Sequence, residues 1–128
     1  IWTDIDYMVD FEDFTVDTTR FPVDRLSSLS NRYHLVPIID AGIKVGNGTG
    51  YVEGHKMDVF IKDPHGEEAQ GWVWPGTTVF VDWFHPNATN YWVKMLNVLR
   101  KSYNFSGIWL DMNEISNFCD GPCVLPKG

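Results

Sequence analysis

Hydrophobic residues gather in three short runs, and each run ends close to an acid. The runs cover residues 1–7, 35–40 and 105–111, and their length and their content of β-branched and aromatic residues predict buried strands. Pro37 lies inside the second run, where it is more typical of an edge strand because proline has no N–H to donate. The acids at the ends of the runs are Asp4 and Asp6, Asp40, and Asp111.

Two segments between these runs repeat apolar residues every three to four positions, which predicts amphipathic helices. One begins after Pro22, a residue suited to a first helical turn. The other spans about residues 86–103 and ends in a basic turn that complements the helix dipole. A helix that feeds an apolar strand is typical of a βαβ unit in a parallel sheet. The apolar positions are Val23, Leu26, Leu29 and Tyr33 in the first helix, and Ala88, Tyr91, Trp92, Met95, Leu96, Leu99 and Tyr103 in the second.

A longer excursion separates the second run from the second helix. Closely spaced glycines predict a loop around Asn47. Two apolar segments, residues 57–61 and 70–74, flank a turn sequence at 63–66, which predicts a hairpin that Trp74-Pro75-Gly76 closes. The glycines of the predicted loop are Gly42, Gly46, Gly48 and Gly50.

Parallel strands that end in carboxylates suit two architectures, an open doubly wound sheet and a (β/α)8 barrel. No glycine-rich phosphate loop follows any of the three runs, so we expect the barrel. The chain of 128 residues opens inside a strand-like pattern and has no initiator methionine. We therefore expect it to be a piece of a longer protein.

Charge and hydropathy exclude some partners. The net charge of -7 argues against a nucleic-acid partner, because proteins that bind a phosphate backbone usually present a basic face. No apolar run approaches the roughly 20 residues of a membrane span. The sequence gives no sign of an oligomeric state, and no cofactor is expected.

Cysteines and sequons favour an oxidising compartment. Cys119 and Cys123 flank a Gly-Pro turn, so they predict either a small local disulfide or pairing with cysteines elsewhere. A lone C-x3-C without a nearby histidine does not predict a metal site. Asn-x-Ser/Thr sequons at Asn47, Asn87 and Asn104, taken with the cysteine pair, indicate a secretory, lysosomal or extracellular protein.

The end of the third run has the chemistry of a sugar site. Strand periodicity places Trp109 and Asp111 on one face, so an aromatic ring for a sugar lies beside an acid that can attack an anomeric carbon. A retaining glycosidase needs such an ionised carboxylate and a second, protonated acid about 5–5.5 Å away. Asp4, Asp6 and Asp40 would gather around Asp111 if their strand ends adjoin.

Each of these residues also has an ordinary structural interpretation. Asp111 can be the cap of a following helix, where Asp is common. Asp6 can pair with a cation such as Arg20, and Asp40 can form a turn. Trp74 can fill the base of the hairpin, and Glu114 can be an acid in a first helical turn.

Several motifs resemble glycoside hydrolase family 31, the retaining α-glucosidases and their relatives, and they occur in the family's order along essentially the whole chain. Residues 2–8 are similar to its W-x-D-I-D-Y-M strand, and 38–43 to its D-P-x-I strand end, with Ala41 in place of proline. Residues 71–76 resemble its G-x-x-W-P-G loop, and 107–118 its W-x-D-M-N-E-x-S-N-F nucleophile signature. Phe14-Thr15 and Phe21-Pro22 fall at its F-T and F-P marks.

The resemblance implies a fold and a set of roles. The fold is α/β, with the chain forming about the second to fourth strands of a (β/α)8 TIM barrel and a hairpin-bearing insertion at about 43–80. Asp111 would be the catalytic nucleophile, and Asp4 would hold hydroxyls of the terminal sugar. The acid/base and further sugar-binding residues would come from later strands. The remaining implied site residues are Asp40, Trp74, Trp109 and Met112 around the first subsite, and Glu114, Ile5 and Ile38 in support.

The resemblance leaves the substrate open within one fold. It implies hydrolysis of terminal α-linked glucose in oligosaccharides or α-glucans. The continuation from Ser116 through Cys123 is similar to the plant and protist branch of acid α-glucosidases and α-xylosidases, so an α-xylosidase is an alternative. Another is a carbohydrate-binding relative that has lost its acid. Ile115 stands where many members have proline, which would alter the loop rather than the chemistry.

Overall fold

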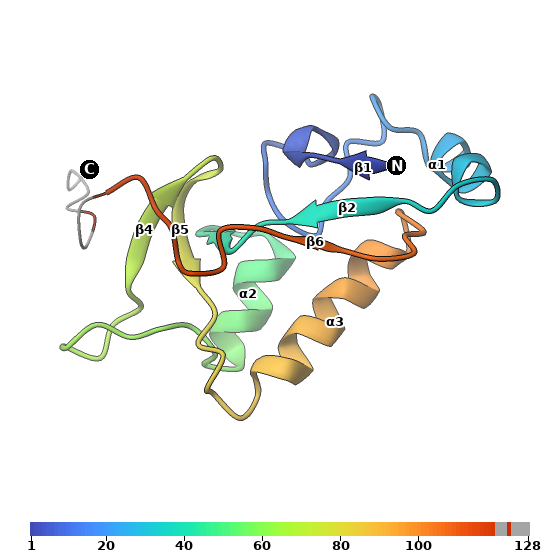
Figure 1. Cartoon of the computed structure of the whole chain (residues 1–128). Coiled ribbons are helices and arrows are strands. Elements are labelled where there is room, and N and C mark those ends of the chain that lie inside the picture. The colour runs from blue at the N-terminus through green and yellow to red at the C-terminus, as the bar shows by residue number, and fades with distance from the viewer. Residues whose placement is uncertain (120–122, 124–128) are drawn as a thin grey trace.

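The three acid-ending runs form one parallel sheet in the strand order β1-β2-β6 (Figure 1). In this computed structural model, which describes residues 1–119 and 123, the strands are β1 (Trp2–Thr3), β2 (Val36–Ile39) and β6 (Trp109–Leu110). Parallel pairing was predicted and is confirmed. Each strand is shorter than its run.

The first strand stops early because Asp4 begins a helical turn. The Asp4 Oδ1 atom accepts a hydrogen bond from the Ile5 N–H at 2.7 Å and caps the short 3-10 helix η1 (Ile5–Tyr7). Aspartate is a favoured N-cap residue, since its oxygen satisfies an amide that the helix leaves free. The prediction of a strand over residues 1–7 is therefore wrong beyond Thr3.

Pro37 lies in the central strand of this sheet. The Val36 N–H donates to the Ile1 carbonyl at 2.8 Å on the β1 side. Because successive amides point to opposite sides of a strand, the Pro37 nitrogen faces β6. Pairing with β6 begins only at Ile38, which lies opposite Trp109, so the strand loses no hydrogen bond that the ladder needs.

Both predicted helices are confirmed, with shorter bounds. They are α1 (Val23–Ser30), which Pro22 precedes as its N-cap, and α3 (Ala88–Arg100). Figure 1 shows α3 beneath β2 and β6, and its predicted apolar stripe enters the core there. The Tyr103 hydroxyl, just past the helix, hydrogen-bonds to Thr3 Oγ1 at 2.9 Å and so ties the end of α3 to β1. The fully buried residues of the predicted stripe are Ala88, Tyr91, Met95, Leu99 and Tyr103.

The excursion folds into an antiparallel sheet of its own, in the order β3-β5-β4. Its strands are β3 (Gly42–Lys44), β4 (Gln70–Val73) and β5 (Gly76–Phe80), and α2 (Thr49–Lys56) follows β3. The predicted turn at 63–66 is confirmed, since the Gly66 N–H donates to the Asp63 carbonyl at 3.0 Å and an isolated bridge joins Lys62 to Glu68 across it. The predicted pairing of residues 57–61 with 70–74 is wrong, because β4 pairs with β5 across the Trp74-Pro75 turn. The loop around Asn47 is present, but Gly42 and Gly50 lie in β3 and α2.

Helix α2 contains glycines because aromatic rings occupy the space that side chains would take. A Cβ atom on Gly54 would lie 2.2 Å from the ring of Phe60, and one on Gly50 would lie 3.2 Å from Phe14. Phe60 is buried and stacks on Tyr51 at 5.8 Å between ring centroids. The glycines therefore reflect close packing rather than a loop.

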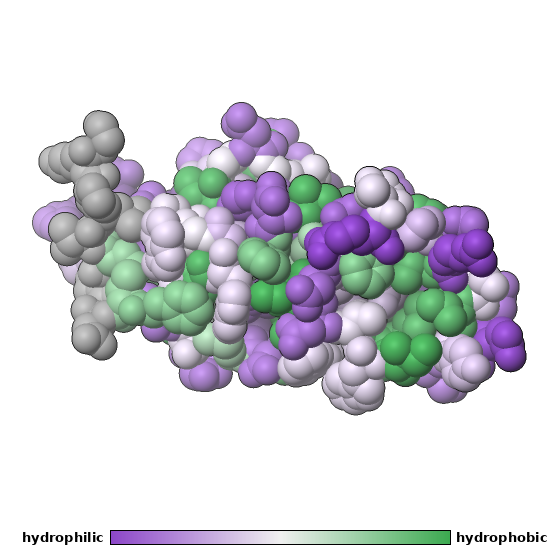
Figure 2. All heavy atoms as spheres, turned by 90° about the horizontal axis from the view of Figure 1, so that it is seen from above, coloured by the Kyte–Doolittle hydropathy of each residue, from purple (hydrophilic) through white to green (hydrophobic). Residues whose placement is uncertain are grey.

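The outer surface of the molecule is mixed. Seen from above in Figure 2, hydrophobic patches are interrupted by hydrophilic residues. Trp2 is 67% exposed and Leu110 54% exposed, so the parallel sheet leaves apolar surface uncovered in the described part of the chain. The helices that the structure describes include none long and apolar enough to cross a membrane.

Candidate active site

Three carboxylates follow directly on the three parallel strands. Asp4 comes after β1, Asp40 after β2 and Asp111 after β6. The ladder pairs Ile39 with Leu110, so the next residues, Asp40 and Asp111, lie side by side. Carboxyl ends of parallel strands meet at one edge of a sheet, and that edge is where such folds bind ligands.

The three acids also share a face of the sheet. Asp4 retains extended backbone (φ -82°, ψ -177°), and its register places it opposite Ile38, two residues before Asp40. Trp109 lies opposite Ile38 on the other side and two residues before Asp111. Because side chains two apart in a strand point the same way, all of these residues face one side.

The charges of the three acids act on one another. Asp40 is buried, with 2% of its surface exposed, whereas Asp4 and Asp111 are exposed. Burial raises the pKa of the Asp40 carboxyl above its usual range; backbone hydrogen bonds from Ala41 and Gly42 oppose this, and the charges of Asp111 and Asp4 raise it further. The Ala41 N–H donates to Asp40 Oδ1 at 2.7 Å, so Asp40 does form the local turn contact expected of it.

Asp111 leads into a turn and not into a helix. Its Oδ1 accepts a hydrogen bond from the Met112 N–H at 2.8 Å, and Ile115 N–H donates to the Met112 carbonyl at 3.2 Å. Met112 and Ile115 both have left-handed backbone, with φ of 58° and 68°. Residues 112–119 contain no helix, so the interpretations of Asp111 as a helix cap and of Glu114 as a helical acid are wrong.

Asp6 lies apart from this arrangement. It is exposed on η1, and Arg20, its suggested partner, instead pairs with Asp17 through Nε–Oδ2 contact at 2.7 Å. Ile5 follows Asp4 in η1 and is partly buried, whereas Ile38 is buried within β2. Ile5 therefore adjoins Asp4 along the chain, and Ile38 lies opposite Asp4 across the ladder.

Two tryptophans lie near the strand ends. Trp109 is partly buried and packs edge-to-face with Trp2, with ring centroids 6.0 Å apart. Trp74 lies in the β4–β5 turn and is 42% exposed, so it does not fill the base of the hairpin. Figure 1 shows this hairpin beyond the carboxyl ends of β2 and β6.

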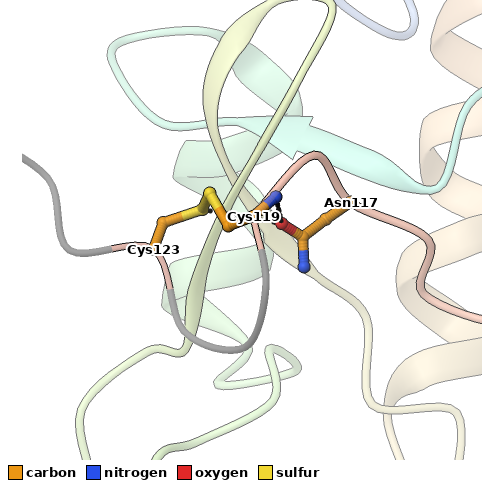
Figure 3. Close-up of a disulfide and its surroundings, with 3 residues drawn as sticks. All are labelled: Asn117, Cys119 and Cys123. Carbon is orange, nitrogen blue, oxygen red and sulfur yellow. Dashed lines mark hydrogen bonds between the residues drawn. A yellow bond between two sulfur atoms is a disulfide. The ribbon is translucent and has the colours of Figure 1, made fainter.

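The segment after Asp111 returns to the hairpin and is fastened there. Phe118 packs edge-to-face on Trp74 at 5.1 Å, and its N–H donates to the Trp72 carbonyl at 2.9 Å. Cys119 and Cys123 form a local disulfide, which resolves the choice between the two predicted pairings. Figure 3 shows Asn117 turned toward this bond, where its Oδ1 accepts from the Cys119 N–H at 2.8 Å.

Sequence patterns missed Asp13, which lies against Asp40. Asp13 is 3% exposed, and its Oδ1 accepts a hydrogen bond from the Asp40 N–H at 2.9 Å. It stands in an acidic, aperiodic stretch, so only the tertiary contact shows that it is buried. No local signal would have separated it from the exposed Asp10 or the half-buried Asp17 nearby.

A cavity of about 580 Å³ lies elsewhere, between the 61–70 segment and the residues after Asp111. Its lining includes none of the three strand-end acids. The candidate site is therefore defined by those acids, since they lie where parallel folds gather their chemistry. The part of the chain that the structure describes has no group of three His, Cys, Asp or Glu side chains placed to hold a metal ion.

A comparison with protein-family models identifies the family that has these motifs and this fold. The model of the glycosyl hydrolases family 31 TIM-barrel domain matches residues 1–128. The chain belongs to glycoside hydrolase family 31. Its three parallel strands are therefore part of the family's TIM-barrel domain.

Family 31 relatives are similar along the whole chain. The chain is 40% identical over 136 residues to a probable alpha/beta-glucosidase of Arthroderma benhamiae, with all of this chain and 16% of that protein covered. It is 43% identical over 133 residues to an alpha-glucosidase of Mucor javanicus, covering 99% of this chain and 15% of that protein. The chain thus spans about a sixth of the length of these curated relatives.

Solved structures of the family share the fold. A glucosidase II alpha subunit superposes with a TM-score of 0.81 at 33% identity, covering 95% of this chain and 14% of that one. A family 31 alpha-glucosidase from Bacteroides thetaiotaomicron superposes with a TM-score of 0.76 at 31% identity, covering 98% and 22%.

Proposed function

We propose that the protein to which this chain belongs is a retaining α-glucosidase that releases terminal α-linked glucose from oligosaccharides or α-glucans. One observation carries the proposal: β1, β2 and β6 each end directly in an aspartate, and these acids share one face. The relatives named alpha-glucosidase support the substrate class.

Asp111 is the nucleophile in this proposal. Its exposed position directly after β6 leaves its carboxylate accessible to a sugar. An Asp111 oxygen bonds to the anomeric carbon while the glycosidic C–O bond breaks, and the leaving oxygen takes a proton from a second acid. Water then attacks the glycosyl–enzyme ester and gives up a proton to the same second residue, which releases glucose with retained configuration and frees Asp111.

The sugar is held by the neighbouring side chains. Asp4 and Asp40 accept hydrogen bonds from hydroxyls of the terminal glucose, since ionised carboxylates are strong acceptors. The rings of Trp109 and Trp74 and the side chain of Met112 line the same subsite. Ile5, Ile38 and Glu114 lie in the same backbone segments as these side chains and help to hold them in position.

The parallel sheet supplies about the second to fourth strands of the barrel in this proposal. Residues of about 43–80, which fold as the separate β3-β5-β4 sheet with α2, form an insertion at the carboxyl ends of the strands. The sequon residues Asn47, Asn87 and Asn104 are exposed, and with the Cys119–Cys123 disulfide they support a secretory, lysosomal or extracellular location.

The test is turnover by the full-length protein with Asp111→Ala. We expect loss of aryl α-glucoside hydrolysis by roughly 10⁴-fold, the order seen when a nucleophile is removed. Added azide should restore part of the turnover by replacing the nucleophile and give the β-glucosyl azide. Asp24→Asn on the exposed face of α1 is the matched control and should retain the wild-type rate.

Two outcomes would contradict parts of the proposal. Wild-type turnover by Asp111→Ala would remove Asp111 from the mechanism. Faster hydrolysis of an aryl α-xyloside than of the α-glucoside would make the protein an α-xylosidase of the same fold.

A further inference from the structure

Asp13 is a buried acid whose one hydrogen bond in the described structure reaches the main chain of Asp40. Its Oδ1 accepts from the Asp40 N–H at 2.9 Å across 27 residues of sequence. Its other oxygen, Oδ2, is buried without a partner among the described residues. Asp40 is the last residue of the 35–40 run. Asp13 therefore holds the backbone at the position from which the Asp40 carboxylate projects.

The loop that carries Asp13 has an unusual backbone. Asp10, Phe11 and Phe14 have φ of 47°, 59° and 64°, a region that residues other than glycine rarely adopt. Such conformations cost free energy and persist where surrounding contacts fix them. Here Thr15 Oγ1 accepts from the Val9 N–H at 3.0 Å and donates to the Glu12 carbonyl, which closes the loop around Asp13.

Among the residues that the structure describes, no cation pairs with this acid. The ion pairs among the described residues do not include Asp13 or Asp40. Burial raises the pKa of Asp13 well above its usual range, and the neighbouring charges of Asp40 and Glu12 add to the effect, against a lowering by the Asp40 backbone hydrogen bond. The other titratable groups that interact with Asp13 are the hydroxyls of Tyr7 and Tyr91, whose pKa values burial also raises.

We propose that Asp13 is a positioning residue whose Oδ1 holds the backbone N–H of Asp40 and so directs the Asp40 side chain toward the sugar. The inference rests on the proposed function, because it takes Asp40 to bind the glycone. The raised pKa of Asp13 favours its neutral form, which accepts the Asp40 N–H without adding a negative charge beside Asp40, Asp4 and Asp111. An ionised Asp13 would oppose the ionisation of Asp40.

Two substitutions of Asp13 in the full-length protein distinguish its role as a hydrogen-bond acceptor from an effect of its charge. Asp13→Asn keeps an oxygen for the Asp40 N–H and is as neutral as the protonated acid, so KM and kcat should stay within threefold of wild type. Asp13→Ala removes the acceptor, so KM for an aryl α-glucoside and the inhibition constant of free glucose should both rise at least tenfold, with a smaller change in kcat. Asp10→Asn in the same loop is the matched control, since Asp10 is exposed and Asn tolerates its left-handed backbone.

Hydrogen–deuterium exchange of the peptide that contains Asp40 gives a readout that needs no turnover. The Asp40 amide should remain protected in Asp13→Asn and exchange faster in Asp13→Ala. If wild-type protein hydrolyses no α-glucoside, the proposed function fails, while exchange still tests the link between Asp13 and Asp40.

Three results would overturn the inference. One is a folded Asp13→Ala protein with wild-type KM, glucose inhibition and Asp40 exchange. Another is Asp13→Asn behaving like Asp13→Ala, which would show that a charge is needed. If Asp13→Ala does not fold, Asp13→Asn alone decides: unchanged kinetics, pH profile and exchange support the inference, and a shifted pH profile contradicts it.

Discussion

Asp40 and Asp111 are register neighbours at the ends of adjacent parallel strands, because β2 and β6 pair Ile39 with Leu110. One of the two carboxylates is buried and the other is exposed. The pKa of Asp40 is raised by its burial and also by the charge of Asp111. Two chemically identical side chains therefore meet different environments within one site, which suits one to bind and the other to react.

Asp40→Asn should weaken glycone binding. The amide keeps the local turn contact with the Ala41 N–H but loses the charge that strengthens hydrogen bonds to sugar hydroxyls. We expect kcat/KM for an aryl α-glucoside to fall roughly 10- to 100-fold, since a hydrogen bond to a charged group contributes about 1.5–3 kcal/mol. Asp24→Asn should leave the steady-state kinetics unchanged. A wild-type kcat/KM in Asp40→Asn would show that Asp40 has only its turn contact.

The stability of the protein should carry a pH dependence from Asp13. Its pKa is raised on folding, so between the unfolded value of about 4 and the folded value the native state binds one more proton than the unfolded state. The free energy of unfolding contributed by this group therefore falls as pH rises through that window. Asp13→Asn cannot titrate, so its melting temperature relative to wild type should increase from about pH 4 to pH 7. A difference that stays constant with pH would contradict the raised pKa.

Gly54→Ala should destabilise the protein although alanine is the better helix former. The helix preference favours alanine by about 1 kcal/mol, but overpacking typically costs about 1–3 kcal/mol. The new Cβ would lie 2.2 Å from the Phe60 ring, which Tyr51 and Tyr91 also contact, so the ring has little room to move. Denaturant unfolding should show a net loss.

Asn90→Ala, on the exposed surface of α3, tests the helix preference without the clash. It should stabilise the protein by a few tenths of a kcal/mol. Equal effects of the two alanine substitutions would mean that Phe60 yields to the extra methyl group.

Removing the disulfide by joint Cys119→Ser and Cys123→Ser should loosen the segment after Asp111. A loop this small contributes about 2 kcal/mol by the chain-entropy model. The Phe118 N–H, bonded to the Trp72 carbonyl, should exchange faster with deuterium. Peptides of α3 should be unaffected and serve as the internal control. Unchanged exchange at Phe118 would show that its packing on Trp74 holds the segment without the disulfide.

Elements with a local cause were the ones that sequence could predict. The spacing from Ala88 to Leu99 follows from burial of one face of α3, and the parallel strands followed from apolar runs ending in acids. The Asp4 cap that shortens β1 has a local signal too, since aspartate before a helical turn is a common N-cap.

Features with a tertiary cause could not be read along the chain. Gly50 was predicted in a loop, and only its packing against the ring of Phe14 accounts for a glycine at this position of α2. β4 pairs with β5, which also pairs with β3, and not with residues 57–61. This order brings together segments that are apart in the sequence, so the local pattern of residues does not predict it. Asp13 has the sequence context of a surface acid, and only the folded Asp10–Phe14 loop shows that it is buried against Asp40.

The strand order β1-β2-β6 also sets a constraint on synthesis. The β6 edge of β2 stays unpaired until the ribosome has released the β3-β5-β4 sheet, α2 and α3, at roughly 5–20 residues per second. Throughout that interval the nascent chain exposes an apolar strand with free amides, the kind of edge on which chains aggregate. The antiparallel sheet consists of β3, β4 and β5 alone, so it can fold before Trp109 and Leu110 pair with β2.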